Sequence, residues 1–148
     1  MISEATDLSI DVAGELRPAL VRIARGLRRE TEQLGITSRQ ATLLWLVRKR
    51  PGTSLGELAA EEGISAPSLS AHVDRLERLR LLERVRSTED RRRVGLRLTP
   101  EGSKVLRSVR ARRTTWLAER LAELPADELD AIATALPALR RLTEVGPA

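Results

Sequence analysis

Apolar residues recur along most of the chain at the three- and four-residue spacing that is typical of one face of an α-helix. This spacing predicts helices over residues 12–34, 37–50, 54–63, 65–79, 100–121 and 125–142. After the fourth of these helices the period falls to two, because Val94, Leu96 and Leu98 alternate with residues of other kinds. Such alternation is typical of a half-buried strand. The pattern therefore predicts a mainly α chain with one small β-wing, in the order α-α-α-α-β-β-α-α.

Residues that favour helix ends stand at the predicted boundaries. Thr37 with Gln40, and Ser54 with Glu57, have the spacing of capping boxes, in which two side chains satisfy the free N–H groups of a first turn. Gly35 follows the first predicted helix, where a left-handed residue is favoured. These local signals support the helical interpretation of the apolar pattern.

The centre of the chain has the succession of a winged helix. Two short predicted helices, 54–63 and 65–79, are joined by a glycine-containing turn and form a helix-turn-helix candidate. The predicted strands 82–86 and 94–98 follow at once, linked by a polar, turn-rich segment. A basic hairpin directly after a helix-turn-helix is the winged-helix arrangement. We therefore expect a winged helix-turn-helix DNA-binding part over residues 37–99.

The predicted helices at the two ends, 8–34 and 100–145, lie outside this part. Their apolar stripes must be buried, and the stripe of the last helix has the spacing of a coiled-coil seam. Pro18 and Pro137 lie inside these stripes and predict kinks. The stripes can fold onto the chain's own core or, as we favour, form a two-fold homodimer. We interpret residues 1–148 as a single domain with a helical dimerisation part.

The charge narrows the choice of partner. The formal net charge is +5, and all but two of the 26 basic residues are arginine. Arginine is suited to paired hydrogen bonds with phosphate and guanine. The two tryptophans are the only aromatic residues, whereas binders of RNA and single strands use aromatic stacking on bases. Double-stranded DNA is therefore the expected partner.

Several classes of protein and site are disfavoured. The chain has no cysteine and one histidine, which excludes thiolate chemistry and a histidine-rich metal site. We find no nucleophile–base pair and no glycine-rich phosphate loop, so we expect no enzyme, no cofactor and no metal. No apolar run approaches the roughly 20 residues that span a bilayer. The first fifteen residues are acidic, unlike a signal peptide. We therefore expect a cytoplasmic protein that does not bind membranes.

The helix over 65–79 is the predicted recognition helix, whose first turns would reach base edges. The candidate contacts there are Pro67, Ser68, Ser70, Ala71 and Arg75. Arg75 can take guanine through two hydrogen bonds, or it can be a solvated partner of a neighbouring acid. His72 lies between faces and is either a packing residue or a further DNA contact. The short side chains of this face leave open a second function, that of an architectural nucleoid protein with little sequence preference.

The wing and two helix N-termini supply further candidates. Three consecutive arginines, of which one can enter a narrow minor groove, are Arg91, Arg92 and Arg93. Asp90 is expected to hold a neighbouring arginine in one rotamer. Free N–H groups at helix N-termini bind phosphate, and the residues at these ends are Thr37, Ser38 and Ser65.

These segments together resemble the MarR (multiple antibiotic resistance regulator) family of winged-helix repressors. The most specific match is the wing pattern Asp90-x-Arg92, five residues, then Leu98-Thr99, followed by Pro-Glu-Gly. The segment Ser54-Leu-Gly-Glu-Leu-Ala, with Pro67-Ser-Leu opening the next helix, is also similar to the helix-turn-helix of that family. The resemblance covers essentially the whole chain.

The resemblance implies a homodimeric repressor that binds a palindromic operator and is released by a small organic effector. It implies that Arg92 enters the minor groove and that Asp90 orients it. The family's effector pocket lies near the second helix, so Trp45 either lines a pocket or belongs to the core. Because cysteine is absent, the family's thiol-based peroxide sensing is excluded, and one histidine does not supply a zinc sensor.

Overall fold

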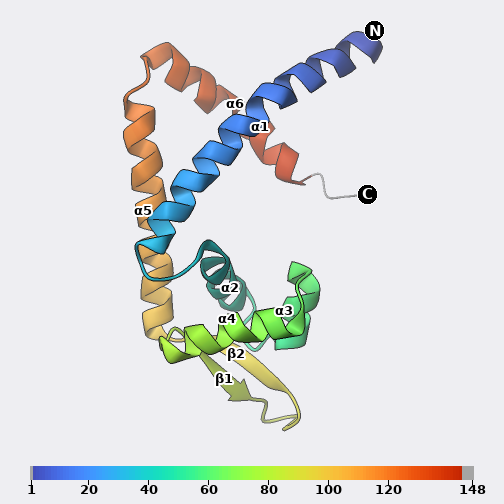
Figure 1. Ribbon diagram of the computed structural model, residues 1–148, viewed down its shortest axis with the longest axis vertical. Helices are drawn as coiled ribbons and strands as arrows, with labels where there is room; N and C mark the ends of the chain where they lie inside the picture. Colours follow the sequence, from blue (N-terminus) through green and yellow to red (C-terminus); the bar gives the residue numbers. More distant parts are fainter. Residues whose placement is uncertain (1, 145–148) are drawn as a thin grey trace. The chain divides into compact units, whose positions relative to one another are not determined.

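The computed structural model describes residues 2–144 and has the predicted order of elements (Figure 1). These elements are α1 (Ile2–Glu32), α2 (Ser38–Lys49), α3 (Leu55–Glu62), α4 (Ala66–Arg78), β1 (Leu82–Arg86), β2 (Val94–Leu98), α5 (Pro100–Ala122) and α6 (Ala126–Glu144). The mainly α fold with a small two-stranded wing is confirmed. Residues 1–113 and 114–148 form two compact units, so α5 begins in the first and ends in the second. The segment 100–145 that we assigned to dimerisation is thus divided between them.

The helix starts follow the capping chemistry in the sequence, with one difference. Thr37 and Gln40 form the full capping box, because each side chain accepts a hydrogen bond from the other residue's backbone N–H, at 3.1 and 3.0 Å. The box predicted at Ser54 and Glu57 is only half formed. Ser54 Oγ accepts from the N–H of Glu57 at 3.2 Å, but the Glu57 carboxylate accepts from the hydroxyl of Thr53. That carboxylate is therefore recruited by residues outside the box.

Neither internal proline ends its helix. Pro18 lies inside α1 and Pro137 inside α6. Helix α1 also begins earlier than the apolar stripe predicts, so the acidic segment that starts at Glu4 is helical. Acidic side chains stabilise the first turn of a helix because they face its positive end, which an analysis of apolar spacing does not take into account.

The hydrophobic core lies in the first unit, among α2, α3, α4, the hairpin and the start of α5. Its buried members are Ile36, Ala41, Leu43, Leu44, Leu46, Val47, Leu58, Ala59, Leu69, Val73, Leu76, Leu81, Leu82, Leu96, Leu106 and Val109. Two apolar residues of these segments lie outside the core. Trp45 on α2, for which the core was one of the two expected places, is 46% exposed, with Lys49 Nζ 4.6 Å from its ring centroid. Leu79, the last residue of the predicted helix 65–79, is 44% exposed and does not continue the buried stripe of α4.

The end of α4 explains the position of Leu79. The N–H of Leu81 donates to the carbonyl of Leu76, and the N–H of Arg80 donates to the carbonyl of Glu77, each at 2.9 Å. This pair of bonds is the Schellman motif, which turns the chain out of the helix. It requires a left-handed residue, and Arg80 takes that conformation with φ of 60°. The turn places Leu81, rather than Leu79, against Leu76 in the core.

The hairpin is tied to the connection that precedes α3. Strands β1 and β2 are antiparallel, with Leu82 opposite Leu98 and Arg86 opposite Val94. On the other edge of β2, Leu96 accepts from the N–H of Gly52 and donates its own N–H to Thr53, both at 2.9 Å. The base of the wing is therefore hydrogen-bonded on both sides.

Candidate nucleic-acid interface

Helix α4 divides into a buried face and an exposed face, as its sequence predicts. Leu69, Val73 and Leu76 are fully buried. The candidate base contacts lie on the other side of the helix: Pro67, Ser68, Ala71 and Arg75 are exposed, and Ser70 is half-buried. Because residues 67, 71 and 75 are four apart, they lie above one another along one helical face. The structure therefore brings most of these candidates together on one exposed surface.

Arg75 has a different neighbour from the one considered in the sequence. Its Nη2 lies 3.5 Å from the carbonyl oxygen of Gly35, in the turn between α1 and α2. This distance is at the outer limit of a hydrogen bond, so the contact is weak. The nearby acids Asp74 and Glu77 bind Arg84 instead. Among residues 2–144, no carboxylate forms an ion pair with the Arg75 guanidinium.

His72 is placed as a packing residue. Its ring is half-buried, and Nδ1 lies 3.4 Å from Nε2 of Gln40 on α2, whose side chain is buried. Of the two roles considered for this histidine, the contact supports the structural one.

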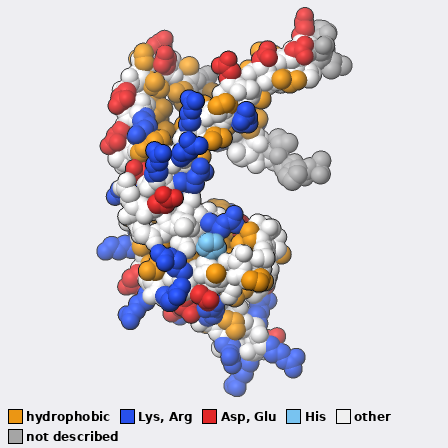
Figure 2. Space-filling model, in the orientation of Figure 1, with side chains coloured by type: hydrophobic (Ala, Val, Ile, Leu, Met, Phe, Trp, Pro, Cys, Tyr) orange, Lys and Arg blue, Asp and Glu red, His pale blue; other side chains and the backbone are white. Residues whose placement is uncertain are grey.

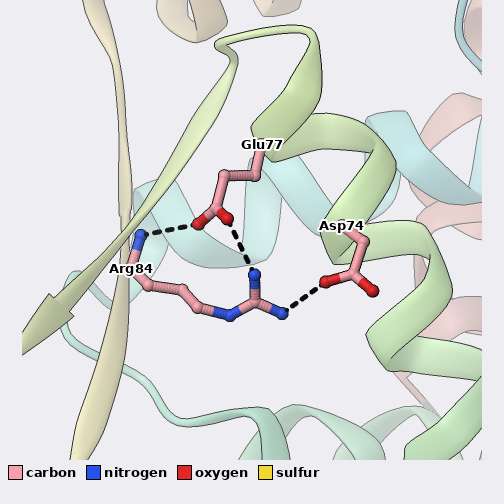
Figure 3. A network of polar contacts seen from close by, with 3 residues as sticks. All are labelled: Asp74, Glu77 and Arg84. Carbon is pink, nitrogen blue, oxygen red and sulfur yellow. Dashed lines mark hydrogen bonds and ion pairs between the residues drawn. The ribbon is translucent and has the colours of Figure 1, made fainter.

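Arg84 joins the hairpin to the recognition helix (Figure 3). Its Nη2 donates to Asp74 Oδ1 at 2.7 Å, and its Nη1 donates to Glu77 Oε1 at 2.9 Å. The backbone N–H of Arg84 lies 3.3 Å from the second oxygen of Glu77. The hydrogen bond that Arg84 donates to Asp74, reinforced by the charge of Glu77, raises the pKa of the Arg84 guanidinium above its ordinary value. A single arginine therefore bridges two acids that lie one turn apart on α4.

The wing tip is a turn organised by Asp90. The Asp90 carboxylate accepts from the backbone N–H of Arg92 at 3.0 Å, and the N–H of Asp90 approaches the hydroxyl of Ser87 at 3.3 Å. This is an Asx-turn, in which a side chain replaces a backbone carbonyl. Our expectation that Asp90 holds an arginine side chain differs from this contact, because the bond is to the backbone. Asp90 fixes the path of the chain through the tip.

The three wing arginines are not equivalent. Arg93 pairs with Glu57 at the start of α3. Arg91 and Arg92 are exposed, and within residues 2–144 no ion pair engages either guanidinium. Figure 2 shows basic side chains gathered at the free end of the hairpin. The wing thus offers Arg91 and Arg92 to a partner, while Arg93 is already engaged.

At the N-termini of α2 and α4, some of the polar groups predicted to bind phosphate already form hydrogen bonds within the protein. The hydroxyl oxygen of Thr37 accepts from the N–H of Gln40 at 3.1 Å, and that of Ser65 accepts from the N–H of Ser68 at 3.3 Å. Ser38, the first residue of α2, accepts from Nη2 of Arg113 at 2.9 Å. The sequence identified Ser38 as a phosphate candidate but gave no indication of this arginine.

Arg113 is a cation without a carboxylate partner among the described residues. Its Nε donates to Thr31 Oγ1 at 2.8 Å, and Thr31 is fully buried. Desolvation lowers the pKa of the Arg113 guanidinium below its ordinary value. The neighbouring Arg112 binds Gln33 and lies 3.4 Å from Glu30, and its Nε is buried without a hydrogen-bond partner. The basic run 104–113 could have drawn attention to both residues, but their burial depends on the fold.

Across residues 2–144, no three acidic or histidine side chains lie close enough together to hold a metal ion. None of the helices described is both long and apolar enough to cross a membrane.

Comparisons with known proteins agree with the geometry. Residues 34–93, which contain α2, the helix-turn-helix and most of the wing, match the MarR family. An uncharacterized HTH-type transcriptional regulator of Mycobacterium leprae is 26% identical over 141 residues, which cover 95% of this chain and 99% of that protein. The HTH-type transcriptional repressor MdtR of Bacillus subtilis is 27% identical over 128 residues, covering 86% and 83% of the two chains.

The similarity extends to solved structures. The crystal structure of the MarR family transcription regulator SP03579 superimposes with a TM-score of 0.71 at 26% identity, covering 97% of this chain and 95% of that one. Fold, wing pattern and sequence similarity agree over nearly the full length. The chain has the winged-helix fold and is similar to proteins of the MarR family.

Proposed function

We propose that the protein is a DNA-binding transcriptional regulator that reads DNA with α4 and the tip of the wing. One observation carries this proposal: the winged helix has two exposed surfaces, the outer face of α4 and the wing tip with Arg91 and Arg92. The exposed face of α4 at Pro67, Ala71 and Arg75 has the size of a surface that enters a major groove. Arg91 and Arg92 lie at the hairpin end, and arginine is drawn to the negative potential of a narrow minor groove.

The protein acts as a homodimer on a palindromic operator. Each unit of the isolated chain leaves apolar side chains in water, which favours burial against a second copy. In the first unit, Leu20 is 48% exposed and Val12 53%; in the second, Leu136 is 42% exposed. The alternative that these helices fold onto their own core does not account for this exposure. Two recognition helices related by a two-fold axis read half-sites about one DNA turn apart, ~34 Å.

The regulator is a repressor that a small organic anion releases. Arg113 and Arg112 supply the binding chemistry, since Arg113 has only hydroxyl partners and Arg112 Nε has none. Arg113 also lies at the first residue of α2, where the helix dipole is positive. Arg112 already has the carboxylate of Glu30 at 3.4 Å, so Arg113 is the cation whose charge is available to an anion. A carboxylate bound there would draw α5 and the start of α2 together, and would shift the winged helix that α2 supports.

Fluorescence anisotropy tests the regulatory function. The probe is the DNA immediately upstream of the protein's own gene, and the control is a scrambled fragment of equal composition. A preference for the native fragment of about 10³-fold or more supports a regulator that reads an operator. Equal binding of both fragments with a steep dependence on salt refutes it, because contacts to phosphate alone give that result. The second outcome indicates the architectural nucleoid protein that the short side chains on α4 also allow.

A further inference from the structure

The bridge formed by Asp74, Arg84 and Glu77 has no part in the proposed contacts with DNA. Arg84 is the first basic residue of the hairpin, yet its guanidinium is directed toward α4 and is held at both ends (Figure 3). Its side chain is 27% exposed, against 61% for Arg97 on the neighbouring strand. The Arg84 guanidinium thus links α4, the proposed recognition helix, to β1, the strand that leads into the wing.

We propose that Arg84 is a positioning residue that fixes α4 relative to the wing, so that the two elements read DNA as one rigid body. Asp74 and Glu77 lie three residues apart on one side of α4, and the planar fork of arginine can hold both carboxylates in a defined geometry. The third contact, from the backbone N–H of Arg84 to Glu77, ties the strand itself to the helix. Three contacts restrict rotation of the hairpin about the turn at Arg80, whereas a single ion pair would leave that rotation free.

The bridge also alters the charge that the DNA meets. Asp74 is 54% exposed on its side chain and lies beside the reading face of α4. An unpaired carboxylate there repels phosphate, and Arg84 neutralises it. The carboxylates of Asp74 and Glu77 are 54% and 41% exposed, so loss of Arg84 leaves neither charge buried without a partner. Removing Arg84 should therefore leave the protein folded while it alters the position of α4 relative to the wing.

The inference rests on the proposed function, and a comparison of two variants tests it. Arg84→Met removes the bridge, and Arg97→Met removes an equal charge from the other strand, where Arg97 pairs with Glu83 across the hairpin. Wild-type protein must first prefer the native upstream fragment to the scrambled one; without that preference the proposed function itself fails. Given that preference, Arg84→Met should lower the ratio of the two affinities about tenfold or more, and Arg97→Met should change it less than twofold.

A direct phosphate contact by Arg84 would give a different result. It would weaken binding to both fragments alike, and would reduce the salt slope by about one for each site occupied. Arg84→Lys separates charge from geometry, because lysine keeps the charge but lacks the planar fork. If Arg84→Lys retains the wild-type ratio, charge alone matters and the positioning role is refuted. In a double-mutant cycle, Glu77→Gln should add little to Arg84→Met, because both break the same bridge.

A second measurement needs no DNA. Because the chain has no cysteine, spin labels attached through Ala71→Cys and Thr88→Cys report the distance between α4 and the wing tip by pulsed electron paramagnetic resonance. Labelled protein is diluted with an excess of unlabelled protein, so that distances between copies do not contribute. The distance distribution should broaden in the Arg84→Met background and stay unchanged in the Arg97→Met background. An unchanged distribution in both backgrounds overturns the inference, whatever the outcome of the DNA assay.

Discussion

Gly102, in the first turn of α5, lies directly against the backbone carbonyl oxygen of Leu81, at the turn that leads into β1. A Cβ at position 102 would clash with that oxygen and with the side chain of Leu98. The N–H of Gly102 meanwhile donates to Thr99 Oγ1 at 3.0 Å, and the Thr99 hydroxyl donates to the carbonyl of Arg80. The start of α5 and the turn before β1 are therefore in backbone contact, which a larger residue would separate.

Gly102→Ala should destabilise the protein by about 1–3 kcal/mol, the usual cost of forcing extra volume into a packed site. The neighbouring atom is backbone and cannot move aside as a flexible side chain would. Gly56→Ala is the matched control, because a Cβ there meets only Ser54 Oγ at 3.9 Å. The control should gain up to about 1 kcal/mol from helix propensity. Urea unfolding of both variants measures the two free energies of unfolding, and equal effects would contradict the close approach.

Arg80→Gly should stabilise the protein by about 1 kcal/mol. Arg80 holds a φ of 60° at the end of α4, a conformation that costs a residue with a Cβ roughly 1–2 kcal/mol. Glycine removes that cost, although it also increases the entropy of the unfolded chain. Gly63→Ala gives the converse case, because Gly63 has φ of 62° at the end of α3 and should lose stability on substitution. A destabilised Arg80→Gly would show that the arginine side chain makes a stabilising contact.

Arg92→Ala should lower affinity for the native upstream fragment about tenfold or more while the protein stays folded. The side chain is exposed at the wing tip and its guanidinium has no ion-pair partner among the described residues. Arg48→Ala, an exposed site near the end of α2, serves as a control of equal charge. Anisotropy at about 0.15 M salt limits long-range charge effects, since the Debye length is then about 8 Å. Equal losses in the two variants would remove the wing tip from recognition.

The double variant Leu20→Gln with Ile23→Gln should shift the protein from dimer to monomer in sedimentation experiments. Leu20 and Ile23 are exposed on α1, and each apolar side chain buried between copies contributes roughly 1.5–3 kcal/mol. The control is Arg22→Gln with Arg25→Gln, on the opposite side of the same helix, which should leave association unchanged. If the first variant associates as wild type does, α1 does not contribute to a dimer interface.

We use 2-hydroxybenzoate as a probe of the proposed anion site. If it releases DNA from the wild-type protein, Arg113→Met should abolish that release without abolishing DNA binding. The carboxylate loses its cationic partner, while the contacts of α4 and the wing remain. Two controls apply: Arg110→Met removes an exposed arginine from the same helix, and 2-hydroxybenzamide has the same shape without the charge. Thermal melting checks that the loss of the hydrogen bonds to Thr31 and Ser38 leaves the fold intact. Ser38→Ala, which keeps the guanidinium, should retain part of the release; full release from Arg113→Met contradicts the anion site.

The elements were predictable because their signals are local. The pairing of Thr37 with Gln40 and the strand around Leu96 depend on residues close in sequence, and the structure has both. Burial along that strand does not alternate strictly, because Gly95 is buried as well as Leu96.

The end of α4 at Arg78 lies within one residue of the predicted end. The turn that follows was not predictable, because its left-handed residue is Arg80, whereas glycine is the usual signal. The burial of Leu81 in the core depends on that turn.

The sequence predicted where the candidate DNA contacts lie, but not which of the arginines already have a partner within the protein. The pattern of α4 places its exposed face correctly, since helical spacing alone decides it. Which arginines are free depends on distant partners: Arg93 pairs with Glu57, 36 residues away, and Arg113 binds Ser38, 75 residues away. Only the folded chain brings those partners together. The adjacent arginines 91–93 therefore look alike in the sequence but have different environments in the structure.

The wing is fixed at its stem, while its tip is exposed apart from the ion pair of Arg93 with Glu57. The stem is bonded to residues 52–53 on one side and, through Arg84, to α4 on the other, whereas Thr88, Glu89 and Arg91 are exposed. Substitutions at these tip positions therefore cost the fold little. If the tip contacts DNA as we propose, exchanging these residues would change which operators are recognised, while the remainder of the winged helix stays as it is.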